Sequence, residues 1–225
     1  MLLHIPNVLM PEEAVEFRRR LDAADWTDGR ETVGAQGARV KRNEQLPDGS
    51  TLKAELGAAV LAALKRSPLF FAAALPRRIL PPRFNRYAGG GEYGFHVDGA
   101  VMQLAEGEQL RSDLSCTLFL NDPGDYEGGR LIVSDTFGEH DIALPAGDAI
   151  LYPSSSLHRV EPVTRGARLA SFFWIQSLVR DNGQRQMLFE MDTAIQKLTL
   201  DGADDNAVLQ LTCVYHNLLR RWSET

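Results

Sequence analysis

The chain has 225 residues, of which 44% are hydrophobic and 24% are charged. These proportions are typical of a globular domain and exclude a disordered or collagen-like chain. With 24 basic and 30 acidic residues, the net charge is −6, which argues against the basic surface that nucleic acid binding requires, so we expect no nucleic acid partner.

The two cysteines and the short apolar runs indicate a reducing, cytoplasmic setting. Cys116 and Cys213 are far apart and no Cys-x-x-Cys occurs, which excludes zinc ribbons and thioredoxin-type chemistry. No basic stretch precedes the first apolar residues, as it would in a secretory signal. The longest apolar runs, 56–64 and 69–75, are much shorter than the roughly 18 residues of a membrane span. We therefore expect a cytoplasmic protein without a membrane partner.

Residues 1–77 are predicted to form an α/β segment that packs on a core. Pro11, followed by acidic residues, predicts the start of one helix. A second helix is predicted after Ser50, because leucines and a valine recur at helical spacing at Leu52, Leu56, Val60 and Leu64. Between the two helices, residues 27–49 are rich in glycine and polar residues, which is typical of loops and short exposed strands.

Residues 78–178 are predicted to form the β core. Short apolar runs alternate with turn clusters that contain glycine, proline and aspartate. The runs cover residues 115–120, 130–133, 149–152 and 169–177. Many short strands at such intervals predict a barrel, a sandwich or a jelly roll.

Residues 179–225 are predicted to form a helical hairpin. Two apolar stripes at helical spacing are separated by Gly202 and neighbouring aspartates, which predict the turn. The hairpin is expected either to pack on the β core or to pair with another subunit in a homo-oligomer.

The strongest chemical signal is the segment 93–99, which contains His96 and Asp98. The two residues are two positions apart, so on a strand both side chains leave the same face. An imidazole and a carboxylate side by side can bind a divalent metal and leave most of its coordination sphere open. One more ligand would complete the two-histidine, one-carboxylate triad that binds non-haem Fe(II).

His158 is the preferred third ligand. It lies 62 residues after His96, which is far enough for several strands to bring the chain back. The other histidines are less well placed: His4 is near the terminus, His140 is in an expected exposed hairpin, and His216 is on the expected last helix.

Arg168, ten residues after His158, begins an aromatic strand that ends at residue 177. A guanidinium at the mouth of an otherwise apolar barrel needs an anion, and its planar fork suits a carboxylate. A dicarboxylic cosubstrate could chelate the metal at one end and bind Arg168 at the other. Arg159 and Arg165 are rival anchors, but Arg159 is out of phase with His158 and Arg165 is at a turn tip.

The loop between His158 and Arg168 sets a condition on this interpretation. If the two residues lie on adjacent antiparallel strands, both point inward only with a three-residue loop, 164–166, which pairs His158 with Phe172. A loop of this type places a left-handed residue at Gly166, so we predict a positive φ there.

Together these residues resemble the motif set of the Fe(II)- and 2-oxoglutarate-dependent dioxygenases. The similarity is to the prolyl-4-hydroxylase-like branch, and in particular to the bacterial PKHD-type hydroxylases, a group linked in some bacteria to iron uptake. Segment 85–93 resembles the tyrosine-glycine lead-in to the first metal histidine, and segment 158–168 resembles the distal end of the motif. A His-x-Asp pair alone arises often by chance, whereas the pair, a distal histidine and an arginine ten residues beyond it form a specific pattern.

The resemblance implies a double-stranded β-helix, or jelly-roll, core with flanking helices. It further implies that Fe(II) binds to His96, Asp98 and His158, that Arg168 binds the far carboxylate of 2-oxoglutarate, and that the Tyr87 hydroxyl donates to this cosubstrate. The implied reaction hydroxylates a C–H bond with O₂ and decarboxylates 2-oxoglutarate to succinate and CO₂, with L-ascorbate as reductant.

Three alternatives stay open from the sequence. A non-enzymatic, cupin-like module could use the same residues to sense iron or 2-oxoglutarate. An oxidative dealkylase of nucleic acid is disfavoured by the acidic charge, and zinc could replace iron on the same ligands. The substrate is not identified: a protein side chain, a peptide, a siderophore-like molecule and a free amino acid remain candidates. We expect its specificity to reside in residues 27–49 and 99–111.

Overall fold

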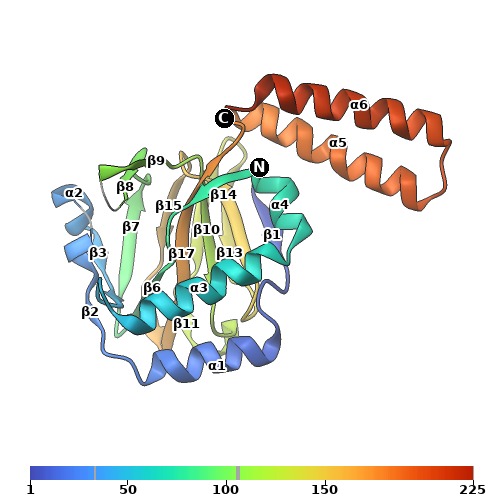
Figure 1. Cartoon of the computed structure of the whole chain (residues 1–225). Coiled ribbons are helices and arrows are strands. Elements are labelled where there is room, and N and C mark those ends of the chain that lie inside the picture. Colours follow the sequence, from blue (N-terminus) through green and yellow to red (C-terminus); the bar gives the residue numbers. More distant parts are fainter. Residues whose placement is uncertain (33, 105–106, 225) are drawn as a thin grey trace.

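The computed structural model describes residues 1–32, 34–104 and 107–224, and its core consists of two antiparallel β-sheets (Figure 1). The larger sheet has the strand order β1 (Leu3–Ile5), β14 (Ala149–Pro153), β10 (Leu114–Phe119), β17 (Ala167–Ser177), β6 (Arg83–Ala88), β4 (Glu44–Gln45) and β2 (Thr27–Asp28), and β5 (Pro76–Ile79) also pairs with β17. The second sheet has the order β13 (Gly138–Ile142), β12 (Leu131–Asp135), β15 (Leu157–Val160), β7 (Glu92–His96) and β3 (Lys41–Arg42). The predicted jelly-roll core with flanking helices is confirmed.

Two smaller strand pairs complete the core. Strands β8 (Val101–Gln103) and β9 (Gln109–Arg111) form a hairpin next to β7, and β11 (Glu127–Gly128) pairs with β16 (Val163–Arg165). Two short helical turns, η1 (Gly29–Thr32) and α2 (Ala35–Ala38), lie before β3, and η3 (Pro123–Asp125) precedes β11.

Three helices, α1 (Pro11–Asp22), α3 (Thr51–Lys65) and α4 (Pro68–Ala74), cover one face of the larger sheet (Figure 1). The predicted starts at Pro11 and after Ser50 are confirmed, and the Ser50 side chain accepts a hydrogen bond from the Lys53 amide. Helix α4 is formed by a short apolar run, and the spacing of apolar residues in so short a run does not distinguish a helix from a strand. Its start signals are the N-cap Ser67 followed by Pro68.

The main hydrophobic core lies between these helices and the larger sheet. Alternation along β17 divides its side chains: Leu169, Phe173 and Ile175 pack toward the helices. The opposite face of the strand presents Arg168, Phe172 and Trp174 to an internal cavity. The sheet therefore supports the core with one face and builds the cavity with the other.

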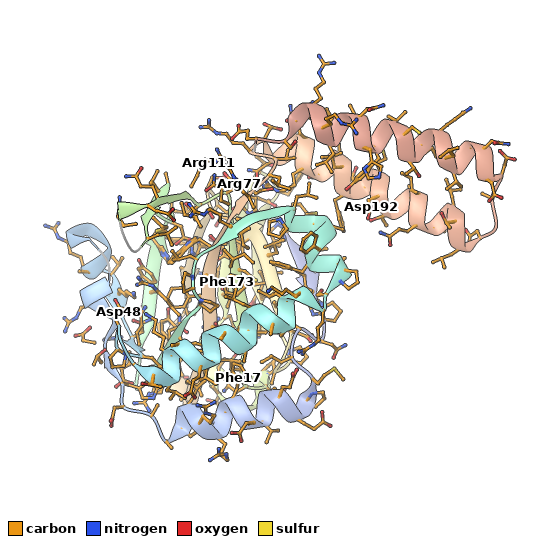
Figure 2. All side chains as sticks on the ribbon, viewed as in Figure 1. Phe17, Asp48, Arg77, Arg111, Phe173 and Asp192 are labelled. Carbon is orange, nitrogen blue, oxygen red and sulfur yellow. The ribbon has the colours of Figure 1, made fainter. Side chains whose placement is uncertain are left out.

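The Phe173→Ala substitution is expected to destabilise the protein by about 3–5 kcal/mol. Phe173 is 1% exposed and lies in the helix–sheet core together with Phe17 (Figure 2). The change therefore removes a buried aromatic ring and leaves a cavity in the core. Urea denaturation measures the loss. The matched control is Phe137→Ala, because Phe137 is 93% exposed and should change the free energy of unfolding by less than about 0.5 kcal/mol. Equal effects of the two changes would contradict this description of the core.

The C-terminal helices α5 (Asn182–Leu200) and α6 (Asp205–Trp222) form the predicted hairpin, with Gly202 at φ 69° in the turn. The hairpin projects away from the β core (Figure 1), and among the described residues it contacts the core near its base, where α5 also packs against α4. There Leu75, Val179 and Leu188 form a small buried cluster. The hairpin is therefore an appendage of the core and does not form a layer over the sheet.

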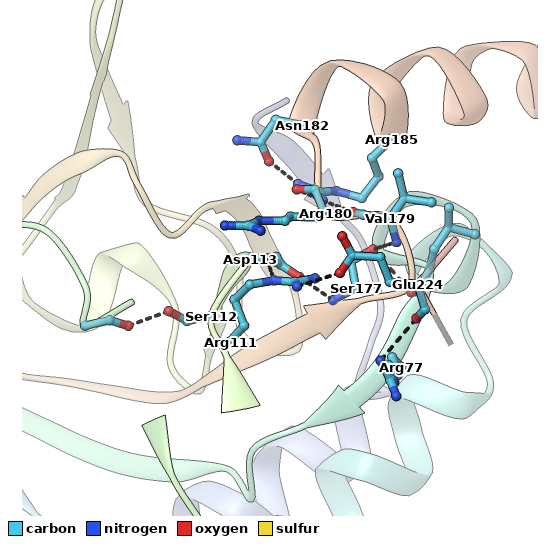
Figure 3. Close-up of polar contacts among 12 residues, drawn as sticks. Arg77, Arg111, Ser112, Asp113, Ser177, Val179, Arg180, Asn182, Arg185 and Glu224 are labelled. Carbon is cyan, nitrogen blue, oxygen red and sulfur yellow. Dashed lines mark hydrogen bonds and ion pairs between the residues drawn. The ribbon is translucent and has the colours of Figure 1, made fainter. Parts of the chain in front are cut away.

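A polar junction fixes the base of the hairpin (Figure 3). Glu224, after α6, accepts a hydrogen bond from Arg111 at 2.7 Å, and Arg111 also binds Asp113 at 2.7 Å. The buried Arg185 donates to the Val179 carbonyl oxygen at 2.7 Å. These contacts connect the hairpin to the end of β9.

In the described part of the chain, no single helix is long and apolar enough to cross a membrane. Helices α3 and α4 reach the length and apolar composition of a membrane span only when they are taken together, and they are bent by 89° relative to each other.

Candidate metal and cosubstrate site

His96, Asp98 and His158 come together at one end of the cavity. His96 and His158 face each other as a directly opposed pair on β7 and β15. The Asp98 carboxylate lies 4.0 Å from His96 Nε2 and 3.8 Å from His158 Nε2, and the three potential ligand atoms lie within 4.8 Å of one another. One detail of the expectation is wrong: β7 ends at His96, so Asp98 reaches the site from the loop that follows the strand.

Both imidazoles are oriented by backbone carbonyl groups. His96 Nδ1 lies 2.8 Å from the Gly94 carbonyl oxygen, and His158 Nδ1 lies 3.0 Å from the Ser156 carbonyl oxygen. A proton on each Nδ1 satisfies these contacts and leaves the Nε2 lone pairs for a metal. Burial, and next the charge of His158, lower the pKa of His96 to about 4, so this imidazole is neutral at pH 7.

The donor set fits a ferrous ion. Two imidazoles and one carboxylate on one side of a cavity match the facial triad of non-haem Fe(II) sites, which leaves three positions open. A further support is the ring of Tyr93, which stacks on His96 with 3.5 Å between the ring centroids.

A pair of serines holds the Asp98 carboxylate. Ser115 on β10 donates a hydrogen bond to Asp98 Oδ2 at 2.6 Å, and its Oγ lies 2.8 Å from Ser154 Oγ. This contact occupies one carboxylate oxygen and leaves Oδ1 for a single bond to a metal. Ser115 was not among the predicted site residues, since a serine inside an apolar strand carries no spacing signal of its own.

The Ser115→Ala substitution is expected to weaken metal binding about 10- to 100-fold, because the carboxylate loses the partner that orients it. Calorimetric titration of the apo protein with Co(II) measures the affinity. Ser115→Thr keeps the hydroxyl and should retain most of it. Ser134→Ala, on the neighbouring sheet, is the matched control. Wild-type affinity in Ser115→Ala would show that the hydrogen bond has no such role.

Arg168 is a buried cation without an anion. It is 1% exposed, and its Nε and Nη2 atoms have no hydrogen-bond partner among the residues that the structure describes. Its guanidinium carbon lies 5.1 Å from the ring centroid of Phe119 and 5.6 Å from that of Tyr87, which is directly opposite on β6. A buried charge without a partner is costly, so this end of the cavity is built for a bound anion.

Tyr87 provides a neutral hydroxyl beside that guanidinium. It is 2% exposed, and burial raises its pKa to about 12, so the hydroxyl keeps its proton at pH 7. A guanidinium and a phenol side by side present donors to a carboxylate.

The strand register differs from the one considered for the loop 164–166. His158 on β15 pairs with Val133 and His96, whereas Arg168 lies on β17 in the other sheet, so the two strands are not adjacent and His158 does not pair with Phe172. The predicted positive φ at Gly166 is confirmed, at 71°. A Cβ at this position would lie 2.3 Å from the Asp125 carbonyl oxygen, so a close backbone approach requires the glycine as well.

The other candidates lie outside the site. His4 hydrogen-bonds to Asp148 at 2.7 Å, His140 binds Asp135 at 2.8 Å, and His216 is on the projecting α6. Arg159 pairs with Glu161, and Arg165 pairs with Glu127 at the surface, so neither needs a bound anion.

The triad, Arg168 and Tyr87 all line one cavity of about 830 Å³. A cavity of this size holds a small molecule together with part of a second one. Its wall includes Lys41, Asn43 and Gln45, which lie in the segment 27–49 where specificity is expected, and also Arg83 and Asn85, which were not among the predicted site residues. Alternation along 83–87 could have placed Arg83 and Asn85 on the same face as Tyr87.

The chain matches two family models. The model described as the 2OG-Fe(II) oxygenase superfamily matches residues 82–176, and the model described as the PKHD-type hydroxylase C-terminal domain matches residues 182–224. A PKHD-type hydroxylase of Stenotrophomonas maltophilia (strain K279a) is 70% identical over 224 residues, and the alignment covers 100% of both chains. A PKHD-type hydroxylase of Xylella fastidiosa (strain M12) is 64% identical over 230 residues, again with 100% of both chains covered.

Solved structures share the fold at low identity. A prolyl hydroxylase from Trichoplax adhaerens, in complex with a hypoxia-inducible-factor peptide fragment, has a TM-score of 0.55 at 16% identity and covers 77% of this chain and 82% of its own. HygX from Streptomyces hygroscopicus, with nickel, 2-oxoglutarate and hygromycin B bound, has a TM-score of 0.53 at 18% identity and covers 76% of this chain and 81% of its own. These likenesses show the jelly-roll fold.

Proposed function

Because the chain belongs to the PKHD-type hydroxylases of the 2OG-Fe(II) oxygenase superfamily, we propose that His96, Asp98 and His158 bind its ferrous ion and that Arg168 and Tyr87 bind 2-oxoglutarate. The protein is an enzyme, an Fe(II)- and 2-oxoglutarate-dependent hydroxylase, and not a sensing module of the cupin type. The observation that carries the residue assignments is a metal triad in the same cavity as a buried guanidinium without an anion.

Each residue has a distinct task in this assignment. The two imidazoles and Asp98 take one side of the metal, so its other positions face the cavity. Arg168 and the Tyr87 hydroxyl bind the far carboxylate of 2-oxoglutarate, which fixes the direction in which the cosubstrate extends toward the triad. Burial of Arg168 keeps water away from this contact and strengthens it.

The bound Fe(II) supplies the redox chemistry by which O₂ hydroxylates a substrate C–H bond while 2-oxoglutarate becomes succinate and CO₂. The apolar and aromatic wall, with Phe172 and Trp174 on β17, excludes water from the reaction. L-ascorbate is typical of the family as a reductant that keeps the iron ferrous, and we include it in the assay below.

Anaerobic addition of 2-oxoglutarate to the Fe(II)-loaded protein tests the site directly. We expect the visible charge-transfer absorption that a 2-oxo acid gives when it chelates ferrous iron, and succinate formation after admission of O₂ with ascorbate present. Protein purified without oxygen should contain iron and not zinc. Absence of the absorption band in protein that holds a full equivalent of iron would reject the assignment.

We also propose that two copies pair through the α5–α6 hairpin. The hairpin exposes apolar side chains away from its base, and α6 has no fully buried residue among those described. Light scattering on the intact chain should give twice the monomer mass, and Leu209→Asp, at a side chain that is 60% exposed, should return it to the monomer mass. A monomeric wild type would contradict the pairing.

A further inference from the structure

The cavity has a polar wall that neither the metal nor the cosubstrate uses. It is formed by the segment 41–45, which consists of β3, Asn43 and β4, and by the adjacent strand β6. Lys41 pairs with Tyr93 in the smaller sheet, and Gln45 pairs with Asn85 in the larger sheet. The segment therefore closes the side of the cavity between the two sheets.

Three side-chain amides on this wall are buried and unsatisfied. Asn43, Gln45 and Asn85 are 7%, 3% and 7% exposed. Both polar atoms of Asn43, Nε2 of Gln45 and Oδ1 of Asn85 have no well-formed hydrogen bond in the described part of the chain, although Asn43 lies close enough to the Tyr87 hydroxyl to act on its pKa. Buried amides are normally satisfied by the fold, so three neighbouring ones that line one cavity indicate polar groups of a ligand.

Two cations flank these amides. Arg83 shares the inner face of β6 with Asn85 and Tyr87, lines the cavity, and forms no hydrogen bond or ion pair with the described residues. The pKa of the Asp48 carboxyl is lowered first by its hydrogen bond to Lys53 and, to a smaller extent, by the charge of Arg83. Asp48 is therefore already paired, with Lys53. Lys41 is 4% exposed, and its Nζ lies 5.3 Å from the ring centroid of Tyr93, next to the metal triad.

The charges of the cavity remain unbalanced after the cofactors are counted. A ferrous ion and the 2-oxoglutarate dianion cancel each other. Among the described residues that line the cavity, the guanidinium groups of Arg83 and Arg168 then face a single carboxylate, that of Asp98. Burial, and next the charge of Arg83, lower the pKa of Lys41 to about 8, while the carboxylates of Asp28 and Asp98 act in the opposite direction.

We propose, on the basis of the proposed function, that the substrate is an amino acid or the C-terminal residue of a peptide, and that its carboxylate binds Arg83. The planar guanidinium suits a carboxylate, and the amides of Asn43, Gln45 and Asn85 provide donors for its oxygens and acceptors for the nitrogen of the substrate. The aliphatic part of the substrate then lies toward the triad, where Phe95, Val97 and Leu157 form an apolar rim around the opening.

Calorimetric titration of the anaerobic complex with Fe(II) and 2-oxoglutarate tests the proposal. The probes are the twenty L-amino acids, each as the free acid, the N-acetyl acid and the carboxamide, at concentrations up to about 10 mM. At least one acid should bind, and its carboxamide should bind at least about tenfold more weakly. Preference for the free acid identifies the amino acid as the source of the carboxylate, and preference for the N-acetyl acid identifies a peptide terminus.

Two matched variants locate the contact. Arg83→Gln should abolish the preference for acid over carboxamide. Arg86→Gln, on the other face of the same strand where Arg86 pairs with Glu44 at 2.7 Å, should keep it. Equal binding of acids and carboxamides, no binding in the whole panel, or an unchanged preference in Arg83→Gln would overturn the proposal. The charge-transfer absorption recorded first separates the outcomes, because its absence would reject the metal and cosubstrate assignment instead.

Discussion

The Asp98→Ala substitution is expected to abolish succinate formation and to weaken Fe(II) binding by at least about 100-fold, more than the loss of a residue that only orients a ligand. Asp98 is the only carboxylate in the group of potential metal ligands found among the described residues, and Ser115 holds it in place. The His96→Ala substitution should have a similar effect. Metal content after desalting and succinate by mass spectrometry are the two measurements.

A histidine away from the site provides the matched control for these variants. His140 is exposed and bound to Asp135, so His140→Ala should keep wild-type metal content and turnover. Metal-dependent succinate formation that persists in Asp98→Ala or His96→Ala would show that the ligands have been misassigned. Circular dichroism of each variant checks that the fold is retained.

The Arg168→Gln substitution is expected to raise the Kd of 2-oxoglutarate about 100-fold, which corresponds to about 3 kcal/mol for a buried charge pair that loses one partner. The same change should not lower the thermal stability of the protein without cosubstrate. In that state Arg168 is a buried charge without an anion, so its removal relieves a cost. The combination of weaker binding and undiminished stability distinguishes an anion anchor from a structural arginine.

Arg165→Gln is the control for Arg168→Gln. Arg165 is three residues away, exposed and paired with Glu127 at 2.8 Å, so its loss should leave 2-oxoglutarate affinity unchanged. Melting curves with and without 2-oxoglutarate give both quantities, because a ligand raises the melting temperature only where it binds. A large fall in the stability of Arg168→Gln without cosubstrate would contradict the assignment.

Local signals in the sequence were sufficient for the helices and for the inward direction of Arg168. Pro11 and the capping Ser50 mark helix starts by local chemistry, and alternation along β17 requires only the strand itself. Local signals do not show which strands pair with one another. A jelly roll transfers the chain between sheets, so β15 and β17 are close in sequence but belong to different sheets.

The individual residues of the polar wall could not be predicted for a related reason, although part of the wall lies in the segment 27–49 where specificity was expected. Asn43 and Gln45 lie in or beside strands of two residues, which are too short to show alternation. Their burial depends on β6 and β7, which lie about 40–50 residues further along the chain. Conversely, His96, Asp98 and His158 could be selected because they resemble a family motif, and the structure brings them together, although the position of Asp98 after the end of β7 was not predicted.

The three proposed metal ligands also connect the two sheets of the core. Both histidines stand on the five-stranded sheet, whereas the hydrogen bond from Ser115 ties Asp98 to the eight-stranded sheet. A metal ion bound to the three proposed ligands would connect the two sheets, and its binding energy would oppose their separation. Amide hydrogens of β7 and β15 should therefore exchange with deuterium more slowly in the metal-loaded protein than in the metal-free protein.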